Sequence, residues 1–105
     1  MRFALLLACA AGIVAAQPPK ADLQHRLGLV ATRAIAYFRS ADSIAASLAE
    51  SGMTLHPDIA TLRARLEAAL DQADAAIGRD DLAAANEALD IAQALLDKFA
   101  ARLGG

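Results

Sequence analysis

The fold is decided by residues 82–103, which read LAAANEALDIAQALLDKFAARL. Apolar side chains recur here at intervals of three and four residues, the spacing that places them on one face of an α-helix. Asp80 or Asp81 is suited to cap the start of such a helix. The pattern therefore predicts a helix over residues 81–103. Its apolar stripe consists of Leu82, Ala85, Leu89, Ala92, Leu96, Phe99 and Leu103.

Two upstream segments show the same spacing. Residues 57–78 begin with a proline, which suits the first position of a helix, and end at Gly78. Residues 21–51 carry a longer stripe and end before Gly52, which can take the left-handed conformation of a helix C-cap. The stripes are Ile59, Leu62, Leu66, Ala69, Ala73 and Ala76 in residues 57–78, and Leu23, Leu27, Val30, Ala34, Tyr37, Ala41, Ile44 and Leu48 in residues 21–51.

Short links between these segments favour antiparallel neighbours. Three helices with one apolar stripe each can bury those stripes only against one another. We therefore predict an all-α, Ala/Leu-rich fold: an antiparallel up-down-up three-helix bundle over residues 21–103, with coiled-coil-like packing. The first helix, with about 31 residues, exceeds its partners, with about 22. It is expected to overhang them, to bend near Ser40 or to pair with another surface.

The beginning of the chain predicts export. Arg2 supplies a positive charge, residues 3–14 form the uncharged run FALLLACAAGIV, and small side chains precede a cleavage site between Ala16 and Gln17. This combination is typical of a secretory signal peptide, and the apolar run is too short to cross a bilayer core of about 30 Å.

We expect residues 1–16 to be removed as a signal peptide and residues 17–20 to form a Pro-rich linker. The exported protein is then periplasmic or secreted, and it meets the membrane only transiently through the signal peptide. Cys9 leaves an alternative open, because Leu6-Leu7-Ala8-Cys9 resembles the lipobox of bacterial lipoproteins. A lipid-anchored protein would follow from it, although the apolar region before Cys9 is shorter than the usual 7–15 residues or so.

Composition and charge exclude several classes of protein. The chain has 105 residues, one cysteine, no tryptophan and a net charge of −2. A nucleic-acid binder needs a basic surface, and a disulfide framework needs paired cysteines. We therefore expect neither a nucleic-acid partner nor a disulfide framework, and the length fits one small domain.

The sequence offers few groups for catalysis or metal binding. Nucleophilic catalysis needs a base beside the nucleophile, and the two histidines, His25 and His56, are expected at opposite ends of the bundle. Asp22 and His25 are three residues apart, whereas metal sites usually need three or four ligands. We expect no catalytic, cofactor-binding or metal residues and no enzymatic activity. A metal- or small-ligand-responsive envelope protein that uses Asp22, His25 and His56 is the alternative.

The first helix carries a broader apolar surface than two neighbours can cover. Leu29, Tyr37 and Phe38 are candidate partner-binding residues, and the alternative is that they belong to the core. We predict a small exported, non-enzymatic helical protein that acts by protein–protein contact or self-association, with an unknown protein or a second copy as its partner.

One stretch resembles a known family. It reads Ala73-x-x-Ala76-Ile77-Gly78-x-x-Asp81-Leu82-x-x-Ala85-x-x-x-Leu89-x-x-Ala92. Residues 66–99, about a third of the chain, thereby resemble a single tetratricopeptide-like helical hairpin, in which small residues stand where the two helices cross. The family stacks about three or more such units, and only one copy is present here. The resemblance implies a helical hairpin with a protein-binding role.

Overall fold

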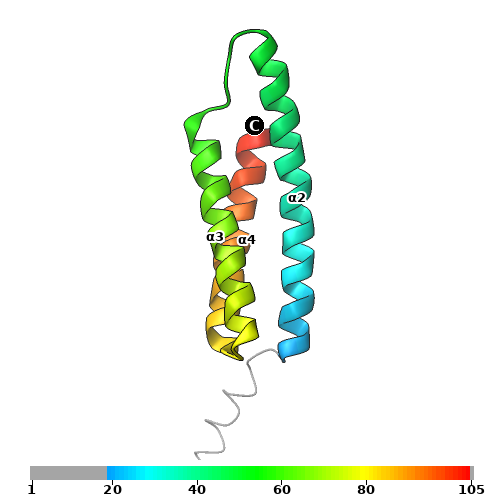
Figure 1. The fold of residues 1–105 in the computed structure, drawn as a ribbon, viewed down its shortest axis with the longest axis vertical. Coiled ribbons are helices and arrows are strands. Elements are labelled where there is room, and N and C mark those ends of the chain that lie inside the picture. Colours follow the sequence, from blue (N-terminus) through cyan, green and yellow to red (C-terminus); the bar gives the residue numbers. More distant parts are fainter. Residues whose placement is uncertain (1–18, 105) are drawn as a thin grey trace, which may run out of the picture.

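The computed structural model describes residues 19–104, which form three α-helices joined by two short connections (Figure 1). These helices are α2 (Lys20–Glu50), α3 (Pro57–Gly78) and α4 (Leu82–Gly104). No strand occurs in this range. The prediction of an all-helical bundle with three helices is confirmed. None of the three helices is both long enough and apolar enough to cross a membrane.

Several expectations concern residues beyond this range. The signal peptide, its cleavage site between Ala16 and Gln17, and Cys9 all lie outside the described residues. Of the expected linker, Pro19 is described and precedes α2, whereas Lys20 already belongs to the helix.

α2 is one continuous helix through Ser40, and it overhangs its neighbours. At about 1.5 Å per residue, its 31 residues span about 46 Å, against about 33–35 Å for the 22 and 23 residues of α3 and α4. Figure 1 shows the last turns of α2 and the following loop extending past the end of α4. Ile44, a member of the predicted stripe, is 37% exposed, whereas Ala45 and Leu48 are partly buried, so Ile44 lies at the edge of the buried face of α2.

The core divides into two clusters along the bundle. One contains Phe38 and Phe99, whose rings meet edge to face with centroids 5.4 Å apart and an interplanar angle of 88°. The other is built largely from alanines of α3 and α4, packed with Leu23 and Leu89. Small side chains let helices approach closely, and α3 and α4 form the most extensively packed pair of helices. These alanines are Ala73, Ala76, Ala85 and Ala88.

Ion pairs at the rim join α2 to the other two helices. Lys20 lies 2.7 Å from Asp80, so the start of α2 is next to the turn between α3 and α4. An exposed pair of this kind contributes less than about 1 kcal/mol. The pairs therefore help to position α2, whereas burial of the apolar stripes stabilises the fold. The other two pairs that involve α2 are Arg26–Asp90 at 2.7 Å and Arg63–Asp42 at 2.9 Å.

Both helix-to-helix turns depend on one residue with positive φ. Gly52 has φ +75°, and the following N–H of Met53 donates to the Leu48 carbonyl at 2.9 Å, so the predicted left-handed cap is confirmed. After α3 the left-handed residue is Asp80, with φ +58°, and not Gly78. Aspartate tolerates this conformation better than most residues. Asp81 then caps α4, because its carboxylate accepts a hydrogen bond from the Ala84 N–H at 3.2 Å.

Candidate functional site

The two histidines have separate positions in the bundle. His25 is exposed near the start of α2. His56 precedes α3, and its Nδ1 accepts a hydrogen bond from the backbone N–H of Asp58 at 3.1 Å. Among residues 19–104, no polar or charged side chain is buried. The hydrogen bond from the Asp58 N–H makes His56 the N-cap of α3.

Replacing His56 with alanine is expected to lower the free energy of unfolding by about 0.5–1 kcal/mol, because one N–H in the first turn of α3 loses its acceptor. Urea denaturation followed by circular dichroism measures this change. His25→Ala is the matched control, since an exposed substitution away from a cap changes stability by less than about 0.5 kcal/mol. Equal effects of the two substitutions would show that the cap contributes nothing.

The alternative metal ligands do not converge in the described part of the chain. Asp22 and His25 are both exposed on α2. Within residues 19–104, no group of three or more His, Cys, Asp or Glu side chains is placed to hold a metal ion. Titration of the protein with zinc, copper and nickel remains the direct test of the metal-responsive alternative.

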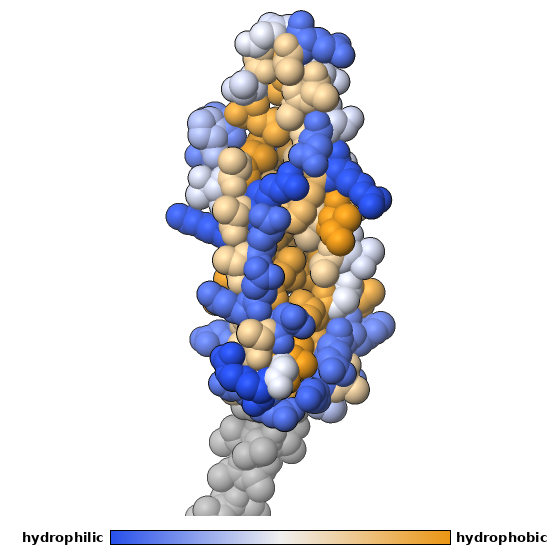
Figure 2. All heavy atoms as spheres, in the orientation of Figure 1, coloured by the Kyte–Doolittle hydropathy of each residue, from blue (hydrophilic) through white to orange (hydrophobic). Residues whose placement is uncertain are grey.

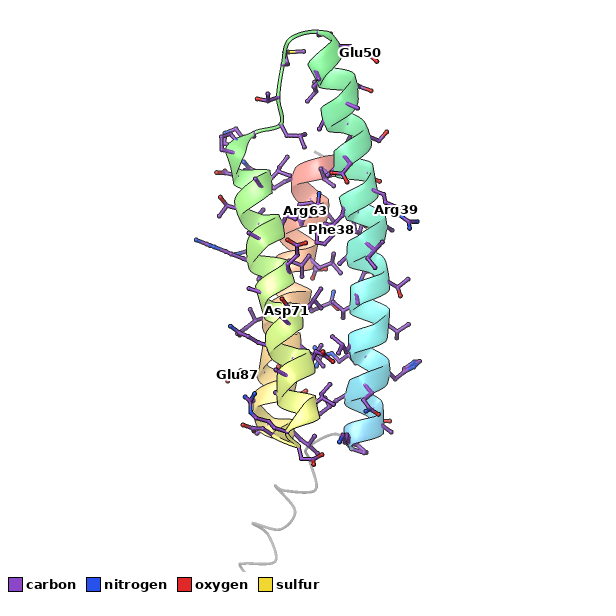
Figure 3. The ribbon with its side chains drawn as sticks, in the orientation of Figure 1. Phe38, Arg39, Glu50, Arg63, Asp71 and Glu87 are labelled. Atoms are coloured by element: carbon purple, nitrogen blue, oxygen red, sulfur yellow. The ribbon has the colours of Figure 1, made fainter. Side chains whose placement is uncertain are left out.

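The three candidate partner-binding residues lie in different environments. Leu29 is 54% exposed, Tyr37 is half-buried, and Phe38 is only 9% exposed. The Phe38 ring packs on Phe99, and the Arg63 guanidinium lies over it, 4.5 Å from its centroid (Figure 3). Phe38 is thus a core residue. Of the three candidates, Leu29 is the most exposed, and it is the one that remains accessible to a partner.

Large exposed apolar side chains concentrate on α2 and the loop after it. Five such side chains are found in residues 19–104, and four of them lie there. Figure 2 shows apolar groups reaching the surface between hydrophilic side chains on the α2 side of the molecule. The four are Leu29, Ile35, Ile44 and Met53, and the fifth, Ile91, lies on α4 and is 50% exposed.

Leu29 and Ile35 flank a strip of smaller residues. Gly28, Thr32 and Ala36 follow one another at intervals of four, which places them on one side of the helix. All three are exposed, as are Leu29 and Ile35. We call these five residues the outer face of α2. On this face two large apolar side chains thus lie beside three residues with smaller side chains.

Gly28 has no role inside the described bundle. A glycine in a helix interior costs about 1 kcal/mol relative to alanine. A Cβ added at Gly28 would meet nothing within 4 Å. No contact within the described bundle therefore requires a glycine here, whereas a second helix packed closely on the outer face would make use of it.

The charges around the outer face are basic. Arg33 and Arg39 are exposed on α2, and neither has an ion-pair partner within residues 19–104. Figure 3 shows Arg39 pointing away from the bundle. The other two cations of α2, Lys20 and Arg26, are held by aspartates of the bundle. The available positive charge on α2 is therefore that beside the outer face.

A scan against protein-family models and searches of the curated proteins and the solved structures found no match to this chain. The resemblance to a tetratricopeptide-like hairpin thus rests on residues 66–99 alone. Those residues form the second half of α3, the turn and most of α4.

Part of the outer face is predictable from the sequence. Leu29 is a candidate from the sequence, whereas Ile35 falls outside the predicted stripe. Gly28 interrupts a strong helical pattern without ending it, and this is the signal in the sequence that marks the outer face.

Proposed function

We propose that this chain is a small exported, non-enzymatic protein, an antiparallel up-down-up bundle that acts by contact through the outer face of α2. The observation that carries this proposal is that Leu29 and Ile35, 54% and 50% exposed, lie beside small residues on one side of α2. A partner that covers exposed apolar side chains on one side of a helix gains free energy by removing them from water.

The partner we favour is a second copy of the chain. In a two-fold contact the same patch meets itself, so the patch must be self-complementary. The outer face meets the steric part of this requirement, because Leu29 or Ile35 of one copy can project over the smaller residues of the other, whereas Arg33 and Arg39 must remain in solvent at the border of the contact. Gly28, which the described bundle does not require, then lets the two helix backbones approach closely.

Leu29→Glu is expected to weaken self-association by at least about tenfold, because it places a charge in an apolar contact. Gly28→Leu is expected to weaken it similarly by keeping the two helix backbones apart, while the fold is retained because that position is open within the described bundle. Sedimentation velocity of residues 17–105 across a wide range of concentrations measures both effects, and circular dichroism verifies that each variant is folded.

Ile91→Glu is the matched control. Ile91 on α4 is as exposed as Ile35, at 50%, but it lies outside the outer face, so this substitution should leave association unchanged. A strictly monomeric parent protein would contradict self-association. If the monomer instead binds a different protein through Leu29, the contact function is retained with another partner.

A further inference from the structure

A second surface feature lies between α3 and α4, away from the outer face of α2. It is a groove of about 430 Å³ between the first half of α3 and the last turns of α4. This volume is within the range of about 300–1,000 Å³ that is common for small-molecule sites. The groove is lined by Asp58, Thr61, Leu62 and Arg65 of α3 and by Lys98, Ala101 and Arg102 of α4.

The groove concentrates positive charge on a chain whose net charge is −2. Three of its seven lining residues are cationic, and Asp58 is the single acid among them. Asp58 lies 2.6 Å from Arg102 and so engages that cation. Arg65 and Lys98 have no ion-pair partner within residues 19–104. Two cations from different helices are therefore available at one site.

The remainder of the lining is largely apolar. Leu62 is half-buried between the charged residues, and Ala101 is small enough to leave room above α4. The Thr61 hydroxyl already donates to the Pro57 carbonyl at 3.4 Å. The groove thus combines a cationic rim with an apolar surface, and Asp58, its one carboxylate, is engaged by Arg102.

We propose that this groove binds a small organic anion, with a phosphate or carboxylate head on a short apolar stem. The Arg65 guanidinium presents paired N–H donors that match either head group, and Lys98 adds a second charge from α4. The stem lies over Leu62 and Ala101. This site is independent of the contact function proposed for the outer face of α2.

Hexyl phosphate, hexanoate, inorganic phosphate and hexanol form the test series, with binding to residues 17–105 followed by amide chemical shifts in NMR. We expect saturable shifts around Arg65 and Lys98 with hexyl phosphate or hexanoate, and weaker binding of inorganic phosphate and hexanol. The two organic anions distinguish a phosphate head from a carboxylate head. Binding of hexanol as tight as that of both anions would overturn the proposal, as would saturable binding of none of the four compounds.

Variants separate the groove from general attraction of anions. Arg65→Gln and Lys98→Gln are each expected to weaken binding of the preferred anion about fivefold to tenfold. Arg39→Gln, which removes an exposed cation of α2, should leave the affinity unchanged. Equal losses for all three variants would show nonspecific charge attraction and would overturn the assignment to this groove.

Discussion

Phe99→Ala is expected to lower the free energy of unfolding by about 3–5 kcal/mol, the usual cost of truncating a buried phenylalanine. Phe99 is fully buried, at 0% exposed. Its ring holds the edge-to-face contact with Phe38, and through it α4 is joined to α2. Removing the ring leaves a cavity and takes away the aromatic partner of Phe38.

The effect is large relative to the total stability of the fold. Small domains are stable by only about 5–15 kcal/mol, so Phe99→Ala should leave a protein that is close to unfolding at moderate temperature. Chemical denaturation followed by circular dichroism measures the loss. Ile91→Ala on the same helix, at a half-exposed position, should cost less than about 1 kcal/mol. A similar cost at Phe99 would mean that the described core is wrong.

Ala73→Leu is expected to destabilise the protein by about 1–3 kcal/mol, because it adds volume where α3 and α4 pack closely. Ala73 is 0% exposed, in the cluster that also holds Ala85 of the facing helix at 0%. A leucine at this position must move one helix or adopt a strained rotamer. Thermal unfolding measures the change.

Ala75→Leu provides the control for Ala73→Leu, because Ala75 lies two residues further along α3 and is exposed. It changes the same residue type in the same helix without entering the interface, so it should shift stability by less than about 0.5 kcal/mol. If both leucines were tolerated equally, α3 and α4 would not be held together by small side chains.

The helices and most of their buried faces were predictable from the sequence, because a spacing of three and four residues determines which side chains share a face. Leu89, Leu96 and Phe99 of the predicted α4 stripe are all fully buried. The exposure of Ile44 was not predictable, since it depends on which part of the broad apolar stripe of α2 the neighbouring helices cover. The left-handed conformation of Asp80 likewise depends on the geometry of the complete turn, which no single residue reveals.

The candidate surfaces were less predictable than the fold. The sequence leaves Phe38 open as a partner-binding or a core residue, because its burial depends on Phe99, which lies 61 positions further along the sequence. The groove between α3 and α4 depends in the same way on Arg65 and Lys98 from separate helices. A periodic pattern assigns residues to faces of one helix, and it does not state which faces of two helices meet.

The most direct test of the central claim is an isotope-filtered NOE experiment on a mixture of labelled and unlabelled protein from residue 17 onward. We predict intermolecular NOEs from the methyl groups of Leu29 and Ile35, together with intramolecular NOEs between the rings of Phe38 and Phe99. Intermolecular NOEs confined to other surfaces, or none at high protein concentration, would contradict self-association through the outer face of α2.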